Sequence, residues 1–162
     1  MGCSQAKPVV HHELLDRCTA PGVKFEEHIE EVNGGKRNVV SWFPESGEPK
    51  AIVLVSHGLG EHALCYYNIA IALVNAGYGV YAIDHVSHGL SDGPRGRIMN
   101  HTTLYADFIA FGNSKRGLHP KLPCFIVAHS MGTLVAMMSV MKITNVSAIV
   151  FSGWLYCSIL IC

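Results

Sequence analysis

The residues that could do chemistry centre on Ser130, which stands where the sequence pattern changes from a strand to a helix. The apolar run 124–128 is typical of a buried strand, and apolar residues recur at helical spacing after Gly132. A serine at the apex of such a turn points clear of the sheet, and its hydroxyl can attack a carbonyl carbon. The chain passes close to itself two residues before and after this serine, so the small Ala128 and Gly132 suit these positions. The sequence therefore predicts a nucleophile elbow, with a buried serine that caps an ordinary helix as the alternative.

Attack by Ser130 would place negative charge on the carbonyl oxygen, and two backbone N–H groups would have to stabilise it. Each such donor lowers the barrier by about 3 kcal/mol. Met131, the residue after the nucleophile, would supply one N–H, and Leu59 in the loop His57-Gly58-Leu59 would supply the other. Gly58 allows the backbone of that loop to approach the carbonyl closely.

Alternating strands and helices are predicted on either side of the elbow. Buried strands are expected at 51–56, 79–84, 124–128 and 146–152, with helices at 63–76, at 102–111 and after Ser130. Two more polar strands, 23–32 and 37–43, are separated by the turn signal Asn33-Gly34-Gly35. This order predicts an α/β fold with a mostly parallel sheet, an N-terminal hairpin and helices on both faces.

Three loops are expected to meet, because the carboxyl ends of parallel strands gather at one edge of a sheet: His57-Gly58-Leu59, Asp84-His85 and His129-Ser130-Met131. Several side chains there could be drawn as metal ligands, namely His57, Glu61, His62, Asp84, His85 and His88. Their spacing matches neither H-E-x-x-H nor H-x-x-E-H, and we expect no metal and no other cofactor. We interpret His57 and His85 as hydrogen-bonded residues that shape the crevice, and Asp84 as a carboxylate that fixes its loop.

The composition narrows the class of protein. The 162 residues fit one domain, and 12 basic residues balance 12 acidic ones, which argues against nucleic acid as a partner. Six cysteines lack C-x-x-C or metal-type spacing, so we expect reduced thiols in the cytoplasm.

The N-terminus resembles a lipidation signal, with Gly2 as the site of myristoylation and Cys3 as the site of palmitoylation, although the pattern has Ser or Thr where Ala6 stands. Two lipids would give peripheral membrane contact. An unmodified tail is the alternative.

The sequence after Ile143 holds no charged residue. Polar residues interrupt this stretch, so we expect a strand followed by an apolar tail, and not a membrane-spanning helix.

Three motifs together carry a family resemblance. The segments H-G-L-G-E-H (57–62), D-H-V-S-H-G-L-S-D-G-P-R-G (84–96) and A-H-S-M-G-T (128–133) resemble, in this order, the monoacylglycerol lipase group of α/β-hydrolases. The resemblance covers about residues 39–152. It implies cleavage of a glycerol monoester of a fatty acid by a triad of Ser, Asp and His without a cofactor. It also implies that Ser130 is the nucleophile and that Leu59 and Met131 form the oxyanion hole.

The sequence departs from that family pattern after the nucleophile. In α/β-hydrolases the triad acid and histidine follow the serine in chain order, but no Asp, Glu or His follows Ser130. We therefore expect an N-terminal tail at 1–22, an incomplete, C-terminally truncated hydrolase domain at 23–153 that lacks the lid and last strands, and a divergent apolar tail at 154–162.

Without a base, the hydroxyl of Ser130 is a weak nucleophile. We do not expect His57, His85 or His88 to replace the missing histidine, and the side chain of His129 should diverge from the serine at the elbow. The chain alone is predicted to be inactive or nearly so. The alternatives are a non-catalytic pseudo-hydrolase that binds acyl lipids or a partner protein, and a site completed by a second chain. The last strand would also form an apolar sheet edge that favours self-association.

Overall fold

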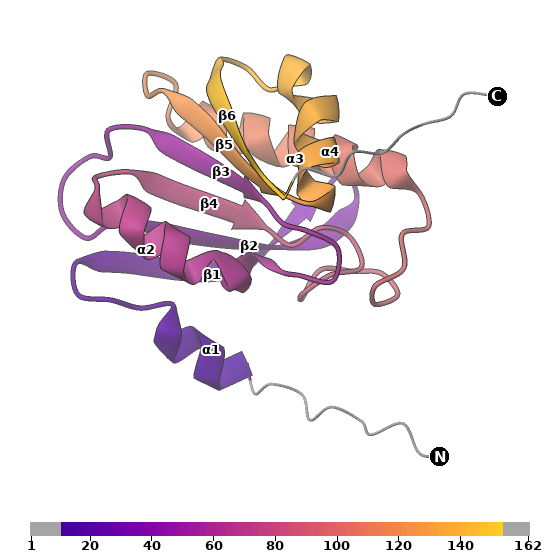
Figure 1. Cartoon of the computed structure of the whole chain (residues 1–162), viewed down its shortest axis with the longest axis horizontal. Coiled ribbons are helices and arrows are strands. Elements are labelled where there is room, and N and C mark those ends of the chain that lie inside the picture. Colours follow the sequence, from indigo (N-terminus) through magenta and orange to yellow (C-terminus); the bar gives the residue numbers. More distant parts are fainter. Residues whose placement is uncertain (1–10, 154–162) are drawn as a thin grey trace.

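The apolar runs of the sequence form the strands of one sheet in the computed structural model, which describes residues 11–153. The six strands lie in the order β1-β2-β4-β3-β5-β6 (Figure 1). Their bounds are Val23–Val32 (β1), Gly35–Pro44 (β2), Ile52–Ser56 (β3), Gly79–Ile83 (β4), Cys124–His129 (β5) and Val146–Ser152 (β6). The β1–β2 hairpin is antiparallel, β2 pairs antiparallel with β4, and all other neighbours are parallel. The predicted α/β class with a mostly parallel sheet is confirmed.

Helices cover both faces of this sheet. They are α1 (His11–Arg17), the 3₁₀ turn η1 (Ala63–Tyr66), α2 (Tyr67–Asn75), α3 (His101–Leu118), α4 (Met131–Ser139) and the 3₁₀ turn η2 (Val140–Lys142). One apolar cluster joins α1, η1 and α2 to one face, and a second joins α3 and α4 to the other. Figure 1 shows α2 and α3 on opposite sides of the sheet.

Burial follows the position of each strand. Every residue of β3 and β4 is buried, because helices cover both sides of these central strands. In β1 most residues are at least partly exposed, and the exposed ones are mainly charged. The central strands are thus rigid supports, and the loops that follow β3, β4 and β5 emerge from them at the same edge.

Two helices differ from the sequence prediction. The segment predicted as an N-terminal tail contains α1, whose Leu14 and Leu15 pack against the cluster around Trp42. Helix α3 runs on to Leu118 and does not end near residue 111. The last turn is polar, so the hydrophobic pattern did not predict that it is helical. Arg116 in this turn is nevertheless buried and donates to the carbonyl oxygens of neighbouring loops.

Some predictions fall outside the described residues. They include the lipidation of Gly2 and Cys3 and the apolar tail 154–162. The limits of the predicted domain, 23–153, also stay a prediction. Among residues 11–153, no helix is long and apolar enough to cross a membrane.

Candidate active site

Ser130 occupies a strained turn between β5 and α4. Its backbone angles are φ 49° and ψ −119°, which only a few non-glycine residues adopt. Such a conformation costs about 1–3 kcal/mol, so the surroundings must enforce it. The N–H of Ser130 donates to the carbonyl oxygen of Ser152 at 3.0 Å, and its own carbonyl oxygen accepts from the N–H of Thr133 at 2.9 Å. The Ser130 side chain makes no capping hydrogen bond, which separates this turn from an ordinary helix start.

The small residues around Ser130 permit a close backbone crossing. A Cβ atom at Gly132 would lie 2.1 Å from the carbonyl oxygen of Ser56 and 2.8 Å from that of His57. Ala128 is fully buried and pairs in register with Ser56 on β3. A larger side chain at either position would push the elbow away from the end of β3.

The loop after β3 touches the elbow. A Cβ atom at Gly58 would lie 3.2 Å from the Cβ of Ser130. The carbonyl oxygen of Gly58 accepts from Nδ1 of His57 at 2.7 Å and from the N–H of Glu61 at 3.2 Å. Because the peptide is planar and trans, this fixes the Leu59 N–H in the opposite direction.

The two amides predicted as oxyanion donors share one property. Within residues 11–153, neither the N–H of Leu59 nor that of Met131 donates to a protein acceptor. Other amides of these loops are paired, including those of Gly58, Ala63, His85 and Ser130, while those of Gly60 and Gly132 have no protein acceptor within residues 11–153 either. Two amides without a protein acceptor beside a strained serine are consistent with the predicted oxyanion hole, which stays a prediction.

Glu61 braces this loop, a role that the sequence did not reveal. Its Oε2 accepts from the N–H of Gly58 at 2.8 Å and from the hydroxyl of Tyr66 at 2.7 Å. Burial alone would raise the pKa of Glu61, but these hydrogen bonds outweigh it and lower the pKa. Its Oε1 lies 3.6 Å from Nε2 of His129. Glu61 stands within the H-G-L-G-E-H motif, but its main partner, Tyr66, lies outside it.

The histidines beside the elbow are committed to holding loops. Nδ1 of His57 donates to Gly58, and its Nε2 accepts from the N–H of His85 at 2.9 Å. Both ring nitrogens are thus engaged, and His57 cannot take a proton from Ser130 in this arrangement. Burial lowers the pKa of His57 to about 4. Nε2 of His85 pairs with the hydroxyl of Ser56 at 2.9 Å, and burial, then His57 and His88, lower the pKa of His85.

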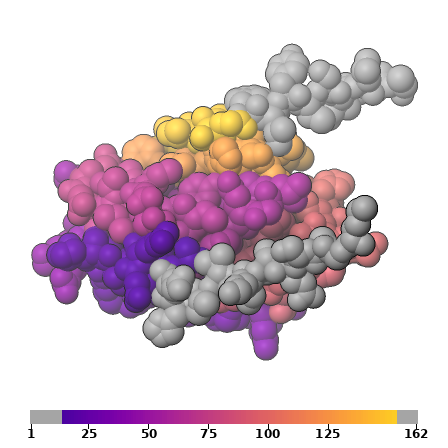
Figure 2. Space-filling view, turned by 60° about the horizontal axis from the view of Figure 1, so that its bottom comes forward, coloured from indigo at the N-terminus to yellow at the C-terminus, as the bar shows by residue number. Residues whose placement is uncertain are grey.

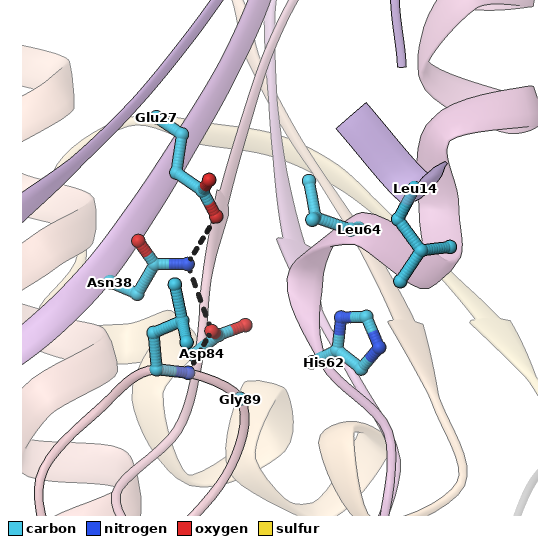
Figure 3. Close-up of a pocket in the computed structure, with 8 residues that line it drawn as sticks. Leu14, Glu27, Asn38, His62, Leu64, Asp84 and Gly89 are labelled. Atoms are coloured by element: carbon cyan, nitrogen blue, oxygen red, sulfur yellow. Dashed lines mark hydrogen bonds between the residues drawn. The ribbon is translucent and has the colours of Figure 1, made fainter. Parts of the chain in front are cut away.

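Asp84 is the centre of a second hydrogen-bonded set (Figure 3). Its Oδ1 accepts from the N–H of Ala63 at 2.6 Å, and its Oδ2 accepts from Nδ2 of Asn38 and the N–H of Leu90, both at 2.9 Å. Figure 3 shows Asn38 between the carboxylates of Asp84 and Glu27. The carboxylate therefore joins β2, η1 and the loop after β4, beside a cavity of about 240 Å³.

The structure brings some predicted residues together and separates others. The loops of Gly58 and Ser130 are in contact, and the rings of His57 and His85 lie against each other at a tilt of 51° with centroids 4.5 Å apart. His129 does not line the cavity beside Asp84, but lines another pocket together with Cys65 and Tyr66. Among residues 11–153, no histidine or carboxylate hydrogen bonds to the Ser130 hydroxyl, and no three His, Cys, Asp or Glu side chains are placed to hold a metal ion.

Several known proteins of similar sequence are named as lipases or esterases. The chain is 33% identical to human "Monoglyceride lipase" over 129 residues, which is 78% of this chain and 42% of that protein. It is 37% identical to "Monoacylglycerol lipase" of Mycolicibacterium smegmatis over 100 residues, or 61% of this chain and 35% of that protein. The chain thus spans about two fifths of the length of these relatives.

Solved structures of an esterase, a lipase and an epoxide hydrolase have a similar fold. A thermostable carboxyl esterase from Bacillus coagulans, crystallised with glycerol, superposes with a TM-score of 0.67 at 29% identity, over 78% of this chain and 43% of that one. A lipase in its open form superposes with a TM-score of 0.69 at 25% identity, over 79% of this chain and 44% of that one. The model of the family described as "Serine aminopeptidase, S33" matches residues 47–156, and the chain belongs to this family of α/β-hydrolases, in which it resembles the monoacylglycerol lipases.

Proposed function

We propose that this chain carries the nucleophile and the oxyanion hole of a serine hydrolase that cleaves fatty-acyl esters such as monoacylglycerol. The observation that carries the proposal is the backbone of Ser130, with φ 49° and ψ −119° on the turn from β5 to α4. The relatives named as monoglyceride lipases and the esterase crystallised with glycerol support the substrate class.

Each residue has a defined part in this proposal. The Ser130 hydroxyl attacks the ester carbonyl carbon, and the N–H groups of Leu59 and Met131 stabilise the oxyanion by about 3 kcal/mol each. Gly58 and Gly132 allow the close approach of the two loops. The supporting residues His57, Ala128, His129, Asp84 and His85 hold the loops or the strand ends that carry them. The proposed chemistry uses no cofactor.

Proton removal from Ser130 is the step that this sequence does not provide. No Asp, Glu or His follows Ser130, and both nitrogens of His57 are engaged elsewhere. Loss of the base of a triad lowers kcat by about 10⁴-fold or more, so we expect the 162-residue chain to turn over esters very slowly. The engaged histidine also favours a second candidate, a non-catalytic protein that binds acyl lipids or a partner protein through the same loops.

Chemical rescue separates the two candidates. The purified chain is incubated with an alkyl fluorophosphonate, with and without imidazole as an external base, and the modified residue is identified by mass spectrometry. We expect labelling of Ser130 that is weak alone and grows with imidazole concentration, because imidazole restores proton removal. Ser130→Ala should abolish labelling, and Ser152→Ala, which removes an exposed hydroxyl nearby, should not.

Two results would decide against the hydrolase proposal. Labelling that is spread over several serines would show that Ser130 has no special reactivity. No labelling at any imidazole concentration, together with saturable binding of a fatty acid, would favour the binding protein.

A further inference from the structure

An apolar stripe runs along the outer side of α4 and η2. Its members lie at positions i, i+3, i+4 and i+7 and are 41%, 45%, 60% and 92% exposed, in the order Leu134, Met137, Met138 and Met141. The opposite side of α4 is buried against the sheet and α3. A helix that is apolar on both sides is normally covered on both sides. We call the exposed set the α4 stripe.

The sheet edge beside this helix is also uncharged. Strand β6 forms one edge of the sheet within the described residues, and its side chains include no Asp, Glu, Lys or Arg. The opposite edge, β1, is protected by charge, with Lys24, Glu26 and Glu30 on one side of the strand. Figure 2 shows β6 (yellow) above the orange residues, at one end of the molecule. This edge of the sheet is therefore not protected by charge.

The segment that follows β6 has the complementary composition. Residues 154–162 carry no charge and contain six large apolar or aromatic side chains: Trp154, Leu155, Tyr156, Ile159, Leu160 and Ile161. We propose that residues 154–162 dock on the α4 stripe and cover it as part of the same molecule. This inference does not depend on the proposed hydrolase function.

The exit point of the segment supports this placement. The carbonyl oxygen of Ser152 accepts from the N–H of Ser130, and a Cβ atom at Gly153 would lie 2.8 Å from Cε1 of His129. The chain therefore leaves β6 beside the first turn of α4. Nine extended residues span up to about 30 Å, whereas the stripe is only about 11 Å long.

The handedness of the strand connections indicates which side of the sheet the chain after β6 covers. The connection from β5 to the parallel strand β6 places α4 on the side of the sheet that also carries α3. A chain that continues past β6 with the same right-handed sense turns back over this side. The apolar residues on the other side, such as Val150, are then the alternative surface for the segment.

Covalent attachment favours the segment over other occupants. A linked partner acts at an effective concentration of about 1 mM, far above the micromolar concentrations of a second copy of the chain. A second copy and a membrane surface are the competing occupants of the α4 stripe.

The test compares three variants, each with one apolar residue replaced by Lys. Met138→Lys disrupts the α4 stripe, Val150→Lys disrupts the opposite side, and Met99→Lys is a matched control because Met99 is 70% exposed in the loop before α3 and belongs to neither surface. The first readout is the rate at which chymotrypsin cleaves after residues 154–156. The second is the emission of Trp154, taken as the difference between each variant and the same variant with Trp154→Phe. The third is the oligomeric state by light scattering.

Docking predicts a monomer in which cleavage is slow and the Trp154 emission is that of an apolar environment. Met138→Lys should speed cleavage by about tenfold and shift the emission to the red, because a charge replaces a buried side chain. The other two variants should behave as the parent. Leu134→Lys should repeat the result, and circular dichroism checks that each variant is folded.

Three outcomes would overturn the inference. Release of the segment by Val150→Lys alone would place it on the opposite side of the sheet. A dimer that dissociates with Met138→Lys would assign the stripe to a second copy. Rapid cleavage in the parent, together with binding to phosphatidylcholine vesicles that Met138→Lys abolishes, would assign it to a membrane.

Discussion

The elbow and the histidine cluster, which consists of His57, His85 and His88, lie at the same edge of the sheet but are built in opposite ways. At the elbow, the backbone is strained and the N–H groups of Leu59 and Met131 have no protein acceptor within the described residues. In the cluster, His57 has both ring nitrogens engaged, and burial lowers its pKa to about 4. Polar groups at the same strand ends are thus either left without a protein acceptor or committed to the fold, and their hydrogen-bond partners distinguish the two cases.

Gly132→Ala should break the elbow and give the largest effect. The new Cβ atom would lie 2.1 Å from the backbone oxygen of Ser56, which cannot move without disturbing β3. We expect a loss of about 3 kcal/mol in the free energy of unfolding, measured in urea. Gly117→Ala is the matched control, since a Cβ there meets nothing within 4 Å and should be neutral or stabilising by up to about 1 kcal/mol. Equal stability of the two variants would show that no close crossing exists.

Acid should weaken the histidine cluster. The pKa of His57 is lowered from 6.5 to about 4 in the folded state, so the unfolded state binds a proton first as the pH falls. The stabilisation is therefore complete above pH 6.5 and is lost between pH 6.5 and pH 4. We expect about 2 kcal/mol less stability at pH 5 than at pH 7 from this residue. The change between these two pH values should be smaller in His57→Gln, and an identical change would contradict a buried neutral histidine.

Glu61→Ala should destabilise the loop that follows β3, with a smaller effect than the two changes above. The substitution leaves the N–H of Gly58 and the hydroxyl of Tyr66 without their acceptor, at a cost of about 1–2 kcal/mol in urea unfolding. Glu61→Gln, which keeps an acceptor, should cost less. Glu31→Ala, at an exposed position on β1, serves as the control. A loss as small as that of Glu31→Ala would mean that Glu61 does not brace the loop.

Local patterns in the sequence predict much of this site. The strands, the turn at Ser130 and the small residues around it are encoded within a few residues of one another, so the pattern of 124–137 is sufficient to place the elbow. The three spaced motifs also indicate the family. These features require no knowledge of distant contacts.

Other features depend on partners far apart in the chain. Helix α1 forms where Leu14 and Leu15 find the cluster around Trp42, and no strong helical pattern marks it. The last turn of α3 is polar, yet Arg116 is buried because it donates to the carbonyl oxygens of Leu122 in the next loop and of Thr144, 28 residues further along the chain. The commitment of His57 to His85 could not be read from the sequence, since these residues belong to different loops.

Ser130 stands on a strained elbow beside two amides that have no protein acceptor within residues 11–153. The proposed oxyanion hole is tested most sharply by a crystal structure of the chain after Ser130 has been modified by an alkyl fluorophosphonate in the presence of imidazole. We expect a positive φ at Ser130 and a phosphoryl oxygen about 3 Å from the backbone nitrogens of both Leu59 and Met131. A helical φ at Ser130, or a phosphoryl oxygen that points away from both amides, would contradict it.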